Sequence, residues 1–133
     1  MNKNLKIPFI CAVYGSLRKP YGNHRVLQDS EFLGTYKTEE KFNLYSLGAF
    51  PCITLNGETN ITVELYKITD PKIAIGLDRL EGYPSFYNRK ITSIINNPFP
   101  EYDIWIYFID NENYSDGKKI EHGDWNLFKL GHE

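Results

Sequence analysis

The stretch that decides the fold is Phe9-Ile10-Cys11-Ala12-Val13-Tyr14-Gly15-Ser16-Leu17-Arg18. Its first six residues are almost all apolar and rich in strand formers, which predicts a buried β-strand over residues 9–14. A glycine follows at once, so we expect a tight turn over Tyr14-Gly15-Ser16-Leu17. Successive backbone N–H groups in such a turn can hold an anion together. The same glycine also fits an ordinary strand end, and alone it does not decide between the two.

A second stretch, Leu77-Asp78-Arg79-Leu80-Glu81-Gly82-Tyr83-Pro84, ends the one clear helix of the sequence. Asp70-Pro71 predicts the start of this helix, because an N-cap acceptor precedes a proline at the first helical position. Gly82 predicts its end. The apolar side chains at helical spacing are Ile73, Leu77 and Leu80.

Within this helix, Glu81 is the carboxylate expected to lie half inside. At about 100° per residue, Glu81 lies about 40° from Leu77 and Asp78 about 100° from it. Loss of hydration raises the pKa of such a carboxyl, which can then take up a proton and return it. A boundary glutamate paired with a lysine or arginine is the commoner alternative for an isolated helix. By the same geometry, we expect Asp78→Asn to cost far less activity than Glu81→Gln.

The other segments predict a sheet. Strands are expected over residues 32–38, 42–47, 61–68, 87–95 and 102–109, with a short helix over 24–29 and a polar loop over 110–117. Asn56-Gly57 predicts a hairpin turn before the strand 61–68. The sum is an α+β fold, a small, mostly antiparallel β-barrel with short helices. A chain of 133 residues is expected to form a single domain over residues 1–133.

Composition excludes several classes of protein. The net charge of −2, without a basic block, argues against nucleic acid as a partner. No apolar run is long enough to cross a membrane, and the apolar stretch near the N-terminus is interrupted by Pro8, so we expect a cytoplasmic protein without an export signal. In that compartment Cys11 and Cys52 are expected to be buried free thiols.

Other chemistries lack their patterns. The sequence contains neither of the glycine-rich motifs that bind nucleotide phosphates. Ser16 lies outside a G-x-S-x-G elbow, so it does not fit a nucleophile. The three histidines, His24, His122 and His132, have no metal-ligand spacing with either cysteine, and no metal site is expected.

Taken together, these motifs resemble the γ-glutamylcyclotransferase-like family. The resemblance begins at Val13-Tyr14-Gly15-Ser16-Leu17-Arg18, ends at Gly123-Asp124-Trp125 and spans nearly the whole chain. The matching residues between them are Asn23, Phe32-Leu33-Gly34, Asn43-Leu44-Tyr45, Phe50-Pro51, Glu64-Leu65-Tyr66, the stretch 77–84, Tyr87 and Arg89. The chain departs from the family pattern at Pro20 and Val63, where a glycine is common.

The resemblance implies a pocket between the first turn and the acidic helix end. It implies that the backbone of Tyr14, Gly15, Ser16 and Leu17 holds the γ-glutamyl moiety of a small-molecule substrate, and that Glu81 acts as general base and acid. The product would be 5-oxoproline, and neither a metal nor an organic cofactor is needed. With the turn and the acid paired in this way, a catalytic role for Glu81 becomes the favoured interpretation. The amine leaving group and the oligomeric state stay open.

Two other functions fit the same sequence. The first is a non-catalytic module that binds a small ligand on the same scaffold, with Glu81 holding a cationic amine. The second is a protein-interaction barrel, because ten tyrosines and two tryptophans are residue types that interfaces favour. Most of these aromatic residues fall in expected strands, which weakens the second alternative.

Overall fold

The computed structural model describes residues 5–18, 22–110 and 117–131. Its elements, in chain order, are β1 (Phe9–Val13), the 3-10 helix η1 (Gly22–Leu27), β2 (Glu31–Ser46), β3 (Pro51–Ile68), α1 (Pro71–Glu81), β4 (Asn88–Thr92), β5 (Ile104–Phe108), β6 (Lys118–Lys119) and α2 (Trp125–Lys129).

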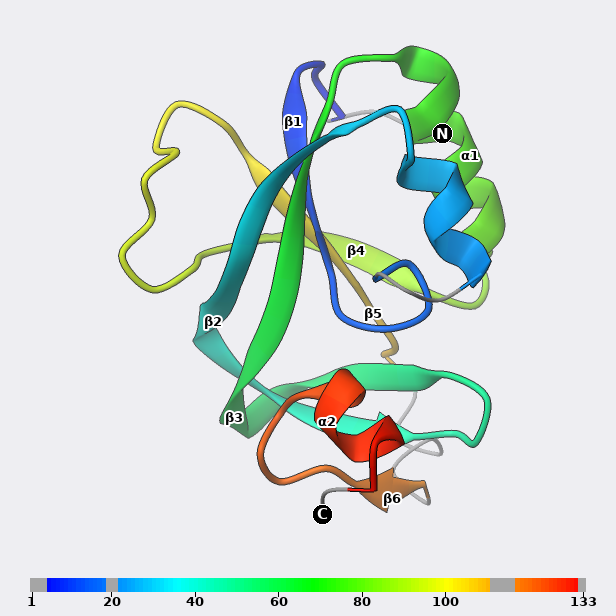
Figure 1. The fold of residues 1–133 in the computed structure, drawn as a ribbon, viewed down its shortest axis with the longest axis vertical. Coiled ribbons are helices and arrows are strands. Elements are labelled where there is room, and N and C mark those ends of the chain that lie inside the picture. Colours follow the sequence, from blue (N-terminus) through cyan, green and yellow to red (C-terminus); the bar gives the residue numbers. More distant parts are fainter. Residues whose placement is uncertain (1–4, 19–21, 111–116, 132–133) are drawn as a thin grey trace.

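The strands form one curled sheet in the order β4-β5-β1-β3-β2-β6. Among the described strands, every pairing is antiparallel except that of β1 with β5. The long strands β2 and β3 bend together, η1 and α1 lie side by side, and α2 and β6 lie at the far end of the bend (Figure 1). Strand β2 also contacts the residues that follow β4, through a bridge between Thr38 and Ile94. This curled half-barrel with few short helices confirms the predicted fold class.

Strand β1 lies inside the sheet and is buried along its whole length. Its side chains alternate between two cores, as the pleat of a strand requires. Ile10 and Ala12 pack into the half-barrel together with Trp125 of α2, whereas Cys11 and Val13 pack beneath Leu77 of α1. Burial on both faces explains why this strand is apolar at every position.

Helix α1 has the ends that the sequence predicts. The Asp70 carboxylate accepts a hydrogen bond of 2.9 Å from the Lys72 N–H, and Pro71 is the first helical residue. Gly82 ends the helix in the left-handed conformation, with φ of 68°. Glu81 is therefore the last helical residue, at the end of α1 from which the chain runs on to β4 (Figure 1).

The hairpin predicted at Asn56-Gly57 is wrong, because both residues lie inside β3. The pairing of the strands shifts there: Asn43 pairs with Thr54, but the preceding Phe42 pairs with Thr59. Asn56 takes a positive φ of 62° at this bulge. A Cβ at Gly57 would lie 2.0 Å from the Phe42 carbonyl carbon. The pair of residues that often makes a hairpin turn therefore allows a bulge in a continuous strand.

Other expectations have mixed outcomes. The strands predicted over 32–38 and 42–47 are one strand, β2, and α2 lies where the sequence predicts no helix. Cys11 and Cys52 are buried and free, as predicted. The predicted loop 110–117 falls mostly outside the described residues, as does His132. In the part of the chain that is described, no helix has the length and apolar character needed to cross a membrane.

Candidate active site

A pocket of about 300 Å³ opens where the chain leaves β1 and where α1 ends. The structure brings the five predicted site residues, Tyr14, Gly15, Ser16, Leu17 and Glu81, to this pocket. The remaining lining residues come from β1, the β2–β3 corner, the end of α1 with the loop after it, and β5: Ala12, Val13, Ala49, Phe50, Pro51, Leu80, Phe86, Tyr87 and Tyr107. Apart from Glu81, the side chains that line it are apolar, aromatic or hydroxyl-bearing.

The turn after β1 is fixed by its own hydrogen bonds. The Arg18 N–H donates to the Gly15 carbonyl oxygen at 2.9 Å, which closes a four-residue turn. The buried Tyr14 hydroxyl donates to the Tyr107 carbonyl at 2.9 Å and accepts from the Ile53 N–H at 3.3 Å. Tyr14 therefore ties the turn to both neighbouring strands, and its hydroxyl proton is already donated within the protein.

Gly15 is needed for close approach and not for an unusual backbone angle, since its φ lies outside the left-handed region. A Cβ at this position would lie 2.6 Å from Pro51 Cγ. The absence of a side chain thus lets the turn lie against the β2–β3 corner. The N–H groups of Gly15 and Leu17 make no hydrogen bond to any described residue. They are available to an acceptor in the pocket.

Glu81 enters the pocket from the end of α1. Burial, and to a lesser degree the negative charge of Asp78, raise the pKa of Glu81 from its ordinary 4.5 to about 7. Its carboxyl makes no hydrogen bond or ion pair with a described residue. A carboxyl in this state exchanges protons readily near neutral pH, and its oxygens are open to a ligand.

Asp78 is more deeply buried than predicted, and the expectation that Glu81 lies closer than Asp78 to the buried face of the helix is wrong. Only 6% of Asp78 is exposed, and the buried residues of α1 are Ala74, Leu77 and Asp78, whereas Leu80 is 41% exposed. The carboxylate accepts hydrogen bonds from Arg89 Nε at 3.0 Å and Nη2 at 3.3 Å, and from the Tyr107 hydroxyl at 2.6 Å.

Arg89 of β4 is the partner that allows this carboxylate to be buried. Its guanidinium also lies over the ring of Tyr83, 4.0 Å from the centroid, and 5.0 Å from that of Trp105. Sequence reasoning missed the pair formed by Arg89 and Asp78, because charged residues in a strand and on a helix are normally expected at the surface. The only signal in the sequence that singled out Arg89 was its match to the family pattern.

Two further ionisable groups, at or next to the pocket, stay protonated at neutral pH. Burial, followed by the charges of Glu81 and Asp78, raises the pKa of the Cys11 thiol, so that this cysteine stays protonated. Burial also raises the pKa of Tyr107, whose hydroxyl keeps its proton and donates a hydrogen bond to Asp78. Within the described ranges, no group of three or more His, Cys, Asp or Glu side chains could hold a metal ion.

Comparison with known proteins gives consistent matches. Residues 11–127 match the family model described as "Gamma-glutamyl cyclotransferase, AIG2-like". A Methanocaldococcus jannaschii protein named as a candidate gamma-glutamylcyclotransferase is 38% identical over 119 residues, covering 88% of this chain and 95% of that protein. The gamma-glutamylcyclotransferase family protein YtfP of Escherichia coli is 32% identical over 114 residues, covering 85% of this chain and 92% of YtfP.

Solved structures agree with these sequence matches. The solution structure of E. coli YtfP has a TM-score of 0.64 and 31% identity, and covers 88% of this chain and 96% of that chain. The crystal structure of a mouse AIG2-like protein has a TM-score of 0.70 and 24% identity, with 88% of each chain covered. The similarity to the mouse protein, at 24% identity, is a similarity of fold.

Proposed function

Because this chain belongs to the gamma-glutamyl cyclotransferase, AIG2-like family, we propose that it cyclises a γ-glutamyl amine or peptide to 5-oxoproline and releases the amine. In this proposal Glu81 is the general base and acid, and the backbone of Tyr14, Gly15, Ser16 and Leu17 binds the γ-glutamyl moiety. The observation that carries the proposal is the shared pocket, in which the Glu81 carboxyl and the N–H groups of Gly15 and Leu17 have no hydrogen-bond partner among the described residues.

The reaction needs positioning and the movement of one proton from the attacking nitrogen to the leaving nitrogen. The substrate α-nitrogen forms a bond to its own γ-carbonyl carbon, closing a five-membered lactam, and the bond from that carbon to the leaving nitrogen breaks. Ionised Glu81 takes the proton that the attacking nitrogen loses and delivers it to the leaving nitrogen. Proton transfer of this kind contributes about 10²–10⁴-fold. Holding nitrogen and carbon about 3–3.5 Å apart contributes up to roughly 7–11 kcal/mol.

The turn and the aromatic rings of the pocket would have different roles in substrate binding. The N–H groups of Gly15 and Leu17 suit the substrate α-carboxylate, because successive backbone donors hold an anion without a cationic side chain. Tyr87 and Tyr107 engage their hydroxyls with Pro51 and Asp78, so their rings form a rigid wall of the pocket. Aromatic rings lower the local dielectric, which strengthens a hydrogen bond made beside them.

The test is a search for product with a matched pair of variants. Wild-type protein is incubated with glutathione, a γ-glutamyl amino acid and γ-glutamyl-ε-lysine, and 5-oxoproline is measured by chromatography and mass spectrometry. We expect product from at least one of them. Glu81→Gln keeps the shape of the side chain, so it should bind that substrate in calorimetry yet lose about 10²–10⁴-fold in turnover.

Glu58→Gln is the control, since it removes an exposed carboxylate that does not line the pocket. It should turn over at the wild-type rate. Saturable binding without 5-oxoproline from any substrate would instead identify a non-catalytic binding module. Wild-type turnover by Glu81→Gln would rule out Glu81 as the general base and acid.

A further inference from the structure

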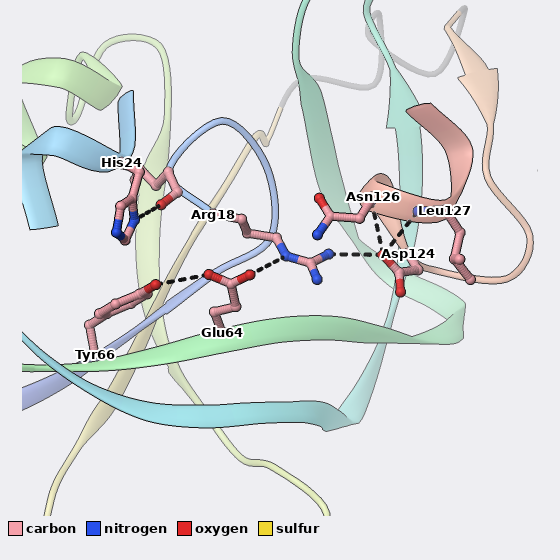
Figure 2. Close-up of polar contacts among 8 residues, drawn as sticks. Arg18, His24, Glu64, Tyr66, Asp124, Asn126 and Leu127 are labelled. Atoms are coloured by element: carbon pink, nitrogen blue, oxygen red, sulfur yellow. Dashed lines mark hydrogen bonds and ion pairs between the residues drawn. The ribbon is translucent and has the colours of Figure 1, made fainter. Parts of the chain in front are cut away.

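Behind the pocket, Arg18 is buried between two carboxylates. Only 4% of the residue is exposed. Its Nε donates to Glu64 of β3 at 3.1 Å, and its Nη1 donates to Asp124 at 2.9 Å, immediately before α2. Figure 2 shows the guanidinium between the two carboxylates, with α2 on one side and β3 below. Arg18 directly follows the substrate-binding turn, and none of the three charged residues lines the pocket.

Both carboxylates are held in place by other contacts. Glu64 accepts a second hydrogen bond, of 2.9 Å, from the Tyr66 hydroxyl. Asp124 caps α2, because the same oxygen that meets Arg18 accepts from the Asn126 N–H at 2.9 Å (Figure 2). The residue before Asp124 is tied to β3 through a 2.9 Å bond from the Thr62 N–H to the Gly123 carbonyl oxygen. The guanidinium is thus clamped by groups that cannot move freely.

The Tyr14–Leu17 turn is also held by a contact with η1. The Leu17 carbonyl oxygen lies 3.0 Å from His24 Nδ1 of η1, and the His24 ring packs against Tyr66 with centroids 5.4 Å apart (Figure 2). Because a carbonyl only accepts, this contact assigns the proton to Nδ1. The last residue of the binding turn is therefore fixed from η1, and the residue after it is fixed from β3 and α2.

A buried cluster of this kind is a poor way to gain stability. Taking three charges out of water costs several kcal/mol per ion, and the attraction between them often fails to exceed that cost. It does fix geometry, because a guanidinium presents its donors in a rigid plane. Backbone donors that bind a ligand must be held to within about 0.5 Å of their productive positions.

We propose that Arg18 is a positioning residue, whose clamp between Glu64 and Asp124 sets the geometry of the Tyr14–Leu17 turn and couples ligand binding there to the C-terminal helix α2. The clamp acts through the turn alone, since its three charged side chains do not reach the pocket. For its kinetic readout this inference rests on the proposed function.

Asp124→Asn tests the coupling without removing the cap. Asparagine is as good an N-cap as aspartate, so α2 keeps its first hydrogen bonds while Arg18 loses one of its charged partners. If the turn binds the substrate equally in the ground and transition states, a turn displaced by Asp124→Asn raises KM and leaves kcat near the wild-type value. We expect KM to rise about tenfold, within the range typical of coupled sites. Arg18→Lys keeps the charge but loses the planar guanidinium that donates to both carboxylates. It should raise KM at least as much as Asp124→Asn does.

Glu40→Gln is the matched control, because it removes one carboxylate from the Glu40–Lys90 ion pair, which is not connected to the turn. Its KM should stay within twofold of wild type. The second readout is hydrogen exchange of the Arg18 backbone N–H, whose bond to Gly15 reports whether the turn is closed. Exchange should be faster in Asp124→Asn than in Glu40→Gln.

The outcomes separate this inference from the proposed function. A folded Asp124→Asn protein with the KM and the Arg18 exchange rate of the control overturns the positioning role. A loss of kcat at unchanged KM also overturns it, because binding through the turn would then be intact. If wild-type protein cyclises none of the γ-glutamyl compounds, the proposed function falls. The exchange measurement then decides the inference by itself: faster exchange supports the coupling and unchanged exchange overturns it.

Discussion

Glu81 has a carboxyl group whose ionisation falls within the ordinary assay range. Burial and the charge of Asp78 raise its pKa to about 7. The proposed reaction uses the ionised form to take the first proton, so we expect kcat/KM to increase with pH through about 7 and then level off, since this ratio reports the free enzyme. The measurement is kcat/KM between about pH 5.5 and 8.5. A flat profile would mean that ionisation of Glu81 does not limit the reaction.

The same ionisation affects the stability of the protein. Glu81 has a pKa of about 7 in the folded state, against an ordinary 4.5, so the folded protein holds the proton more tightly than the unfolded chain. The stabilisation from protonated Glu81 is therefore complete below about pH 4.5 and is lost as the pH rises to about 7. Glu81→Gln removes this ionisation.

We accordingly expect Glu81→Gln to be more stable than wild type at pH 8, by on the order of 2–3 kcal/mol. The difference should shrink as the pH falls towards 4.5. The measurement is the free energy of unfolding in urea for both proteins at several pH values. Comparing the two proteins cancels the other titrating groups. A difference that does not change with pH would contradict a raised pKa in the folded state.

At the scale of an element, α1 shows where sequence reasoning succeeds and where it stops. Its start at Asp70-Pro71 and its end at Gly82 were predictable, because capping depends on residues adjacent in the sequence. Its buried face was only partly predictable. Leu77 is buried and Ile73 partly buried, as their spacing suggests, but Leu80 is exposed and Asp78 is buried in its place. The burial of Asp78 depends on Arg89, which lies on a different strand. Hydrophobic spacing within one helix holds no information about such a partner.

The Asp78–Arg89 pair should therefore lock α1 onto the sheet. Asp78→Asn leaves the buried Arg89 guanidinium without its counter-charge, and we expect a loss of about 3 kcal/mol in unfolding free energy. Arg79→Gln, on the exposed side of the same helix, should change it by less than about 0.5 kcal/mol. Both are measured by urea unfolding. Adding Arg89→Met to Asp78→Asn removes the orphaned charge, so the double variant should regain part of the loss. Losses that simply add would show that the two residues are not coupled.

At the scale of the whole molecule, the class of fold was predictable and the path of the chain was only partly so. The continuous runs of apolar and aromatic strand formers in β1 and β5 identify strands wherever they lie in the sheet. The two expected strands form the single strand β2, which bends where the register of its pairing with β3 shifts. That shift lies at residues 37–41 of β2 and depends on β3. Helix α2 is five residues long and is held by Trp125 in the barrel core, so its short sequence has little helical signal of its own.

Thr38 lies at that bend and should contribute to closing the half-barrel. It is fully buried, its hydroxyl donates to the Glu40 carbonyl at 2.7 Å and accepts from the Ile61 N–H at 2.9 Å, and its backbone bridges to Ile94. Thr38→Val keeps the volume but leaves a buried N–H unpaired, so we expect the unfolding free energy to fall by about 1–3 kcal/mol. Thr38→Ser keeps the hydroxyl and loses one methyl group, at about 1 kcal/mol.

The comparison of these two variants by urea unfolding separates the hydrogen bonds from packing. If the hydroxyl closes the half-barrel, valine costs more than serine, although valine has nearly the shape of threonine. Equal or reversed losses would mean that the methyl group, and not the hydroxyl, matters at the bend. Because Thr38 does not line the pocket, KM measured well below the unfolding transition should be unchanged in both variants. A changed KM would show that the closure of the barrel also shapes the site.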